Sequence, residues 1–541
     1  MNPWPASARL WWALAGVPVA FLGLFFLWPA GTVIARGLLE GGDLAGALDV
    51  LASERTLRAI ATTVVLALAG TAGSLALGIP AAWALSRFEW RGRRAMRALV
   101  TVPFVLPTIV VAAAFSALFS ASGVLGFLGL DQSMAAIILA LVFFNVSVVV
   151  RIVGGAWESL SPRMADAART LGASPARAFA RVTLPALKPA IASSAAVVML
   201  FCSTSFALVL ILGGSRIRTV ETEIYVQVNQ FLDLRAAAVL ALVQVVFVGI
   251  ALWVSARARS PRPPAAVETM RRPGSRERAG IAAALAPAVV LLVLPALALI
   301  ERSLRVTGGY GLDHYAALFG EPPMRSTLSA PVWEAMVTSL VTAAVATVFA
   351  GVVGIVTAQL VARPSRRASW LESLVMLPLG VSAVVVGLGV LLTLNRSVLG
   401  VDLRGSWWLV PIAQAVVALP LMVRALVPAA RAIDPRLRAA AATLGASPWR
   451  ALWRVDAPLL RSAVGASLAF AFAIAMGEFG ATAFVARPDS PTLPTAIARL
   501  LSRPGIDNVG MAFAASVLLA AVTAAVMLAS ERLRTTVGAE I

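Results

Sequence analysis

The sequence Pro-Arg-Met-Ala-Asp-Ala-Ala-Arg-Thr-Leu-Gly-Ala-Ser-Pro occupies residues 162–175, and Pro-Arg-Leu-Arg-Ala-Ala-Ala-Ala-Thr-Leu-Gly-Ala-Ser-Pro occupies residues 435–448. The second copy begins 273 positions after the first, and the same offset carries Arg177 onto Arg450 and Pro185 onto Pro458. Self-similarity at a constant offset indicates a duplicated structural unit. The chain is therefore expected to consist of two tandem repeats.

Long apolar segments surround both copies. Each exceeds the ~20 residues that a helix needs to cross a bilayer, and a backbone without water must satisfy its own hydrogen bonds as a helix. We predict an all-α polytopic membrane protein with about twelve transmembrane helices in two tandem six-helix repeats. The predicted spans lie near residues 11–35, 59–85, 98–120, 134–157, 190–212, 236–256, 280–300, 335–362, 371–394, 406–428, 462–486 and 509–530.

Composition supports this class of protein. The 541 residues are 60% hydrophobic and only 13% charged, against about 25% charged in soluble domains. This excludes a soluble, disordered or disulfide-stabilised chain. The net charge of +19 would suggest nucleic acid binding in a soluble protein. Here the arginines lie in short loops between apolar spans, where they set membrane orientation, and no nucleic acid partner is expected.

The basic loops also predict the domain organisation. Residues 1–256 form the first half, 257–278 an Arg- and Pro-rich linker, and 279–541 the second half. The linker and the loops after the second span of each half fall on one side, which the positive-inside rule makes the cytoplasm. Both termini are then cytoplasmic in a cell (inner) membrane, the first span is a retained anchor, and residues 121–133, with Asp131 and no basic residue, lie outside.

Between its fourth and fifth spans, each repeat carries a short Ala-rich stretch that favours a helix. Gly172 or Gly445 follows, a residue suited to a helix C-terminal turn. A short exposed helix fixed at both ends by membrane spans can transmit force from a soluble partner. The alternative is an ordinary surface helix, which the duplication on the predicted cytoplasmic face disfavours.

Asp-Ala-Ala-Arg-Thr-Leu-Gly-Ala-Ser-Pro at 166–175, followed by Val-Thr-Leu-Pro-Ala-Leu at 182–187, resembles the EAA loop of binding-protein-dependent ABC importer permeases. We call residues 162–187 the first EAA loop and residues 435–460 the second. The resemblance covers nearly the whole chain and implies the type I ABC importer permease fold. A single chain with two halves is most similar to the fused permeases of the thiamine and ferric-iron group.

The resemblance implies that these loops hold coupling helices for two copies of an ABC ATP-binding subunit. An extracytoplasmic solute-binding protein would deliver a small-molecule solute. ATP and Mg would bind the partner, so this chain would hold no cofactor and would not be an enzyme. Ala439 departs from the pattern by replacing the expected acid. The implied docking residues are Asp166, Ala167, Ala168 and Gly172, and Ala440, Ala441 and Gly445.

The residues themselves agree with a chain that is not an enzyme. Its only lysine, Lys188, precedes Pro189, so no Gly-Lys-Ser/Thr phosphate loop is present in the sequence. The sequence also holds no recognisable catalytic dyad or metal-ligand cluster, and His314 is expected at the surface.

Glu478 is the strongest candidate for the translocation path, because a carboxylate within a membrane span usually faces the bundle interior or water. An equally weighted alternative is an interhelix hydrogen bond beside Gly477 and Gly480. Three hydroxyl residues occupy the matching region of the first half, although backbone bonding is commoner for such groups. They are Ser203, Thr204 and Ser205.

Other polar and proline residues in the spans favour structural roles. Asn145, Gln244 and Gln414 are expected to bond neighbouring helices. Prolines are expected to kink or end helices at positions 103, 107, 378 and 411.

The solute remains open at this point. Ser-Phe-Ala-Leu-Val-Leu-Ile-Leu-Gly-Gly at 205–214 and Thr-Val-Glu-Thr-Glu-Ile-Tyr at 219–225 resemble thiamine permeases, whereas Met-Gly-Glu-Phe-Gly-Ala-Thr at 476–482 is similar to thiamine, sulfate and molybdate permeases alike. Thiamine is favoured, with ferric iron or an oxyanion as alternatives. A secondary transporter with twelve helices is a more distant alternative, since it does not require the duplicated cytoplasmic helix.

Overall fold

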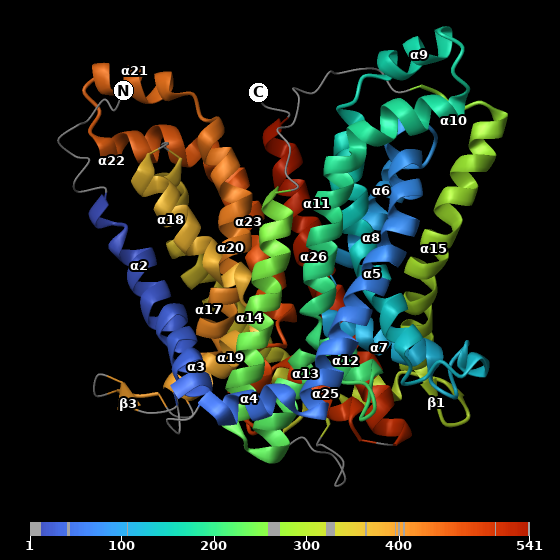
Figure 1. The fold of residues 1–541 in the computed structure, drawn as a ribbon. Coiled ribbons are helices and arrows are strands. Elements are labelled where there is room, and N and C mark those ends of the chain that lie inside the picture. Colours follow the sequence, from blue (N-terminus) through green and yellow to red (C-terminus); the bar gives the residue numbers. More distant parts are fainter. Residues whose placement is uncertain are drawn as a thin grey trace. The chain divides into compact units, whose positions relative to one another are not determined.

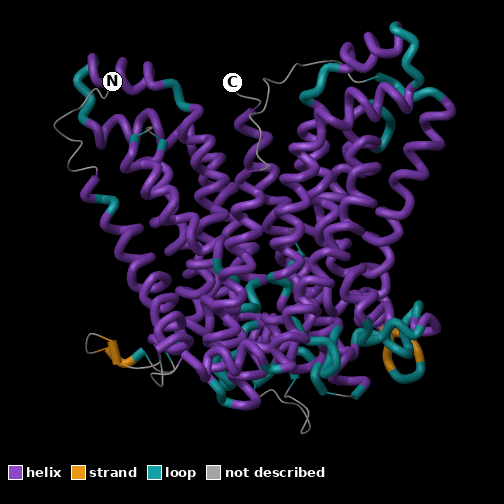
Figure 2. Tube along the Cα trace, viewed as in Figure 1, coloured by secondary structure: helices purple, strands orange, loops and turns teal. Residues whose placement is uncertain are grey.

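The computed structural model describes residues 12–39, 44–104, 106–257, 271–320, 330–362, 365–394, 397–398, 401–403, 406–503 and 505–538. Helices dominate these residues, as the tube in Figure 2 shows. The strands among them form two short pairs, β1 (Arg305–Val306) with β2 (Gly309–Tyr310) and β3 (Ser397–Val398) with β4 (Val401–Asp402).

Ten helical stretches of the described residues are long and apolar enough to cross a membrane. An eleventh candidate is a pair of helices, Arg366–Gly380 and Ala383–Leu394, bent by 96°. The shorter apolar helix Thr108–Phe119 lies at the corresponding place in the first half. The all-α polytopic fold class is therefore confirmed.

Several predicted spans are not continuous helices. The span predicted at 98–120 is broken near Pro103 and Pro107, and the one at 371–394 is broken after Pro378. The spans predicted at 190–212 and 462–486 end at Ser203 and Gly477 and resume as short helices. Proline removes a backbone donor and clashes with the preceding turn, which explains the first two breaks.

The chain forms two structural units that differ from the two sequence halves. Unit 1 comprises residues 1–48, 227–242 and 306–541, and unit 2 comprises residues 49–226 and 243–305. The N-terminal helix α3 (Trp28–Leu39) therefore packs with the second half, against α19 (Ala383–Leu394). Conversely, α15 (Ser275–Leu304) packs with the first half, against α5 and α7. The first span of each sequence half therefore belongs to the unit that the other half mainly forms.

In unit 2, the long helix α5 (Glu54–Arg87) packs along α8 (Met134–Glu158). The approach is close, since a Cβ on Gly78 would lie 2.6 Å from Val149 Cβ, and small residues at such contacts are typical of membrane helices. The unit also holds α6 (Arg93–Thr101), η3 (Val102–Phe104), α7 (Thr108–Phe119), η4 (Gly126–Leu128), α9 (Pro162–Thr170), α10 (Pro175–Ala178), η5 (Phe179–Thr183), α11 (Leu184–Ser203), α12 (Phe206–Leu212) and α13 (Val220–Val226).

In unit 1, α17 (Val332–Val361), α20 (Leu409–Ala432) and α23 (Ala457–Gly477) pack together in the same way. Gly351, the repeat counterpart of Gly78, again marks a close approach, here to Leu468. The other elements of unit 1 are α2 (Gly16–Leu22), η2 (Gly23–Leu27), η6 (Gln227–Phe231), α16 (Asp313–Ala317), α18 (Arg366–Met376), η7 (Leu377–Gly380), α21 (Pro435–Thr443), α22 (Pro448–Ala451), η8 (Leu452–Asp456), α24 (Thr482–Val485), α25 (Leu493–Leu501) and α26 (Ile506–Gly538). Two further helices, α4 (Leu44–Ala52) and α14 (Leu234–Arg257), have residues in both units.

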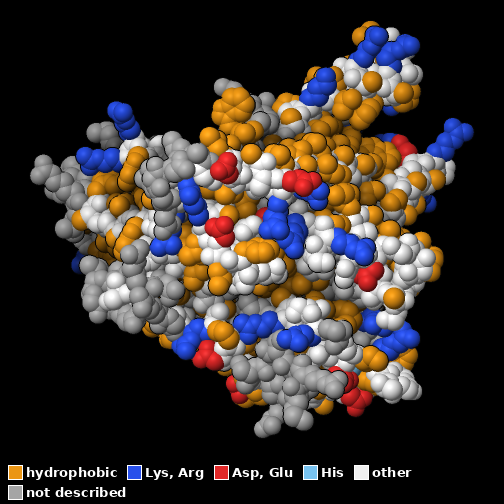
Figure 3. Space-filling view, turned by 60° about the horizontal axis from the view of Figure 1, so that its bottom comes forward, with side chains coloured by type: hydrophobic (Ala, Val, Ile, Leu, Met, Phe, Trp, Pro, Cys, Tyr) orange, Lys and Arg blue, Asp and Glu red, His pale blue; other side chains and the backbone are white. Residues whose placement is uncertain are grey.

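In each unit, the short helices of the EAA loop lie at one end of the long helices: α9 and α10 in unit 2, α21 and α22 in unit 1 (Figure 1). Figure 3 turns the opposite ends forward and shows basic side chains, coloured blue, among Asp and Glu side chains, coloured red. Two ion pairs at these ends are Arg218–Glu223 at 3.4 Å and Arg487–Asp489 at 3.1 Å. In these two pairs an arginine is accompanied by a carboxylate.

Candidate functional site

The first EAA loop begins with a capped helix. The Ser161 hydroxyl accepts the Arg163 N–H at 3.3 Å, and proline occupies the first turn of α9, both typical of a helix N-terminus. At the other end, Gly172 has φ +87°, and the N–H groups of Gly172 and Ala173 donate to the carbonyls of Arg169 and Ala168. This left-handed glycine turn satisfies the last carbonyls of the helix.

The second EAA loop repeats this geometry. The Asp434 carboxylate accepts the Arg436 N–H at 2.8 Å, and Gly445 has φ +77°. The N–H groups of Gly445 and Ala446 donate to the carbonyls of Ala442 and Ala441, as in the first copy. Because both glycines need a left-handed conformation, the prediction of a glycine turn after each Ala-rich helix is confirmed.

Both loops continue through a second short helix. Ser174 and Ser447 accept the N–H groups of Arg177 and Arg450, each at 3.3 Å, and so begin α10 and α22. These helices pass through the single π-helical turns η5 and η8 into the long helices α11 and α23. In each unit two short helices thus follow one another, and we call each pair an elbow. The first elbow is α9 with α10 and the second is α21 with α22. The second helix of each elbow is continuous with a membrane span.

The expected docking residues gather on these elbows. Asp166 is exposed and lies 3.8 Å from Arg169 on the same helix, and Ala167 is also exposed. Leu171 and Leu444, one residue before the two glycines, are 89% and 87% exposed. The structure brings together Asp166, Ala167, Ala168 and Gly172 on the first elbow and Ala440, Ala441 and Gly445 on the second, and their docking role stays a prediction.

The two elbows are fastened by different chemistry. In the first loop, the ring of Phe179 on η5 stacks on Trp157 of α8, with centroids 6.1 Å apart and planes 23° apart. In the second, Arg438 of α21 donates through Nε to both oxygens of Asp456 on η8, at 2.8 and 3.1 Å, and both side chains are buried. The repeat counterparts of this ion pair are Ala165 and Thr183, which cannot form one.

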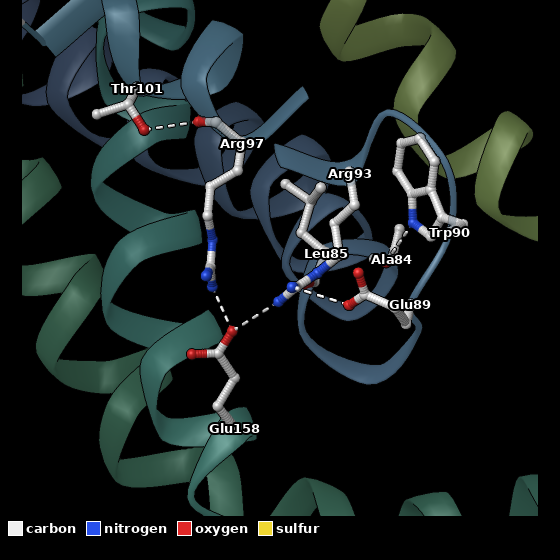
Figure 4. Close-up of polar contacts among 8 residues, drawn as sticks. All are labelled: Ala84, Leu85, Glu89, Trp90, Arg93, Arg97, Thr101 and Glu158. Carbon is white, nitrogen blue, oxygen red and sulfur yellow. Dashed lines mark hydrogen bonds and ion pairs between the residues drawn. The ribbon is translucent and has the colours of Figure 1, made fainter. Parts of the chain in front are cut away.

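A cluster of ionic contacts fixes the entrance to the first loop (Figure 4). Glu158, the last residue of α8, accepts Arg93 Nη2 at 3.2 Å and also pairs with Arg97, both on α6. The buried Arg93 side chain donates further to Glu89 at 3.3 Å and to the Leu85 carbonyl at 2.7 Å. At the second entrance, Arg431 donates to Glu372 at 2.7 Å. Arg93 and Arg97 belong to the basic loop after the second span, whose sequence indicates membrane orientation and gives no sign of these ion pairs.

The C-terminal end of the predicted linker is packed. Residues 258–270 lie outside the described residues, but the Arg271 carbonyl accepts the Glu89 N–H at 3.0 Å, and its guanidinium lies 5.5 Å from the centre of the Phe88 ring. Residues 275–278, which we had placed in the linker, already belong to α15. The predicted linker therefore ends in packed structure, and the second half begins a few residues before the predicted boundary.

The path candidates lie at the two helix breaks. Glu478 is 6% exposed, and its carboxylate oxygens accept the N–H groups of Ala481 and Thr482 at 2.7 and 2.9 Å, which caps α24. Ser203 and Thr204 donate to the Leu200 carbonyl at 2.8 and 3.0 Å, and Ser205 precedes α12. These contacts give the side chains structural partners, and their place in a path stays a prediction.

Other expected roles can be compared directly with the structure. Gln244 of α14 donates to the Ser203 carbonyl of α11 at 3.1 Å, an interhelix bond as predicted. His314 was expected at the surface, but it is buried, because α16 packs on α26 and its ring lies against Gly510, which has no side chain to exclude it.

Comparison with known proteins places this geometry in a family. The family model described as "Binding-protein-dependent transport system inner membrane component" matches twice, at residues 74–260 and 350–537. Each match contains one EAA loop, so the family model finds the duplication that the sequence predicted.

Among curated relatives, the Thiamine transport system permease protein ThiP of Brucella abortus (strain 2308) is 26% identical over 526 residues, covering 93% of this chain and 92% of its own length. The Sulfate transport system permease protein CysT of Salmonella typhimurium is 29% identical, covering 42% of this chain and 84% of its own. A solved bacterial ABC transporter for alginate import has a chain 20% identical, with a TM-score of 0.40, covering 47% of this chain and 96% of that one. The double match shows that this chain belongs to the binding-protein-dependent transport system inner membrane components, as a fused permease with two halves.

Proposed function

We propose that this chain is the complete membrane subunit of an ATP-driven importer, which forms the translocation path for a small solute. The duplicated elbow carries the proposal, because each copy presents a short exposed helix, anchored at its entrance, that is followed by a second short helix continuous with a membrane span. Two copies of an ATP-binding subunit would dock on α9 and α21, on the cytoplasmic side.

In this mechanism, ATP closes the dimer of ATP-binding subunits and draws α9 and α21 together. Each elbow passes the movement to its long helix, and the two units rock between inward-open and outward-open states around a fixed path. An extracytoplasmic binding protein would deliver the solute. ATP and Mg²⁺ would bind only the partner, so this chain would not itself be an enzyme.

Thiamine is the proposed solute. The support is that a thiamine permease relative aligns over 93% of this chain and 92% of its own length, which matches the two-half chain as a whole. The residues at 205–214 and 219–225 also resemble the thiamine branch. Ferric iron or an oxyanion remains the alternative.

The experiment is reconstitution in liposomes with the proposed ATP-binding subunit and the proposed solute-binding protein. We expect ATP-dependent uptake of labelled thiamine that excess ferric iron or sulfate does not inhibit. Uptake of iron or sulfate in place of thiamine would refute the proposal that thiamine is the solute. Uptake driven by an ion gradient without the ATP-binding protein would refute the importer class.

A further inference from the structure

Arg93 connects three segments of unit 2 through one buried side chain (Figure 4). Its guanidinium donates through Nε to the Leu85 carbonyl in the last turn of α5, through Nη1 to Glu89 in the turn after α5, and through Nη2 to Glu158 at the end of α8. A planar guanidinium holds its donors in a fixed fork, whereas a lysine ammonium is a point charge on a flexible stem. The junction therefore needs arginine, although either residue would satisfy the positive-inside rule.

The turn that carries Glu89 is held by the segment that leads into α15. Phe88 and Arg271 form a single parallel β-bridge, in which the Glu89 N–H donates to the Arg271 carbonyl at 3.0 Å. The Arg271 side chain lies over the Phe88 ring and pairs with Glu277 on α15. Glu277 also accepts the Gly274 N–H at 2.8 Å and so caps that helix. Arg271 thus connects α15 to the turn after α5.

The connection from Glu158 to the helix α9 is also ordered. The two residues after Glu158 donate back to carbonyls in the last turn of α8, at 2.7 and 3.2 Å, and Ser161 then caps α9. We call Arg271, Glu89, Arg93 and Glu158 the Arg93 network. It leads from α15 to the point where the first elbow begins, and contiguous contacts of this kind can couple distant positions.

The second repeat has different residues at these positions. Both carboxylates of the network are replaced there, one by a methyl group and the other by a second basic side chain, and like charges repel instead of pairing. The counterparts of Glu89, Arg93 and Glu158 are Ala362, Arg366 and Arg431. These positions can therefore form the Arg93 network in the first repeat only.

We propose that the Arg93 network positions the first elbow for coupling, so that the segment leading into α15 takes part in ATP-driven transport. Arg93 and Arg271 are then positioning residues, which act on α9 through Glu158. The inference rests on the proposed function, because a partner must move α9. With the network intact, this movement passes to the long helices of unit 2. With the network broken, part of the movement is lost at the loosened joint, and ATP is hydrolysed without transport.

The test reconstitutes the full chain in liposomes with the proposed ATP-binding subunit and solute-binding protein, and measures labelled thiamine taken up per ATP hydrolysed. Arg93→Lys keeps the charge but loses the fork, so uptake per ATP should fall at least about twofold while hydrolysis continues. Arg94→Lys is the matched control, since Arg94 is exposed on the same helix and its replacement should leave the ratio unchanged. An unchanged ratio for monodisperse Arg93→Lys protein would overturn the proposal. So would uptake and hydrolysis that fall in the same proportion, because loss of folded protein lowers both equally.

Arg271→Ala tests the other end of the network in the same assay. Arg271 is exposed, so its replacement should leave the protein folded even if Arg93→Lys does not. It should lower uptake per ATP, whereas Arg272→Ala, which removes the same charge from the same segment, should not. Equal effects of these two alanine variants would count against the network and for a general effect of charge.

The combined variant tests whether both residues act through one network. Adding Arg271→Ala to Arg93→Lys should lower uptake per ATP little further than the larger single effect. Fully additive effects would show two independent roles and would overturn the proposal. If the wild-type chain showed no ATP-dependent uptake, the proposed function would fail instead.

Discussion

Glu158 and Arg431 occupy the same position in the two repeats, at the ends of α8 and α20, and they carry opposite charges. Each pairs with a short helix earlier in its own half, Glu158 with two arginines of α6 and Arg431 with Glu372 of α18. An exchange of partners would bring Glu158 against Glu372 and leave the arginines together. The ion pairs therefore fix each loop entrance and also distinguish one half from the other.

Glu158→Ala should destabilise the protein more than Arg431→Ala. The first change leaves the buried Arg93 without one carboxylate and should cost about 1–2 kcal/mol, whereas loss of the more exposed second pair should cost less than about 1 kcal/mol. Thermal unfolding of both purified variants in detergent checks the order. The double exchange Glu372→Arg with Arg431→Glu should regain stability, and a larger loss from Arg431→Ala would contradict the ranking.

Removing one member of the Arg438–Asp456 pair should be costly. Arg438→Met leaves a buried carboxylate uncompensated, for which about 3–5 kcal/mol is typical. The combined Arg438→Met and Asp456→Leu variant should recover most of this loss, because no buried charge remains. The measurement is a double-mutant cycle on unfolding midpoints. Similar losses for the single and combined variants would show that the two charges are not coupled.

Gly172→Val and Gly445→Val should each abolish transport and the stimulation of the partner's ATPase while the chain still inserts in the membrane. A Cβ would meet nothing within 4 Å at either glycine, so the expected cost of about 1 kcal/mol or more comes from the left-handed φ alone. Asn tolerates this φ and is the matched replacement, which should retain activity. Asp166→Ala should be milder than Gly172→Val. If transport survived both valine substitutions, the elbows would not be the elements that transmit movement from the ATP-binding subunits.

Glu478 caps α24 and is also predicted to attract a cationic solute. The substitution Glu478→Gln affects both roles, although Gln has nearly the same shape as Glu. Both oxygens accept backbone N–H groups, so the amide nitrogen of Gln leaves one buried donor unpaired, at about 1–3 kcal/mol. If Glu478 also attracts a cationic solute, uptake per folded molecule should fall with partner docking and basal ATPase retained. Uptake and the yield of monodisperse protein measure the two effects. Unchanged uptake per folded molecule, with Glu478→Leu unfolded, would leave only the capping role.

Reporter fusions test the proposed orientation. Fusions at both termini and within 257–278 should score cytoplasmic, and fusions near residues 125 and 225 should score outside. The physical reason is the concentration of arginines in the linker and in the loops after the second spans. An outside score in the linker would overturn the arrangement of six spans followed by six.

The repeat made much of the fold predictable. A constant offset located both elbows, and apolar length located the spans, because a helix in lipid must be long and apolar. Hydropathy does not say which helix packs beside which, so the exchange of α3 and α15 could not be read from it. The pairing of Arg93 and Arg97 with Glu158 could not be predicted either. In sequence, an arginine that sets membrane orientation looks the same as one that forms an ion pair.

The exchange of first spans has a consequence for biosynthesis. The helix α3 leaves the ribosome early, yet the surface it packs on, α19, begins more than 340 residues later, at Ala383. Gly389 of α19 accommodates Pro29 so closely that a Cβ there would lie 3.1 Å from the Pro29 backbone. Until that helix is inserted, α3 must wait in the lipid without its final neighbour. The first half can therefore enter the membrane during translation, but its N-terminal helix can reach its native packing only after much of the second half has been made.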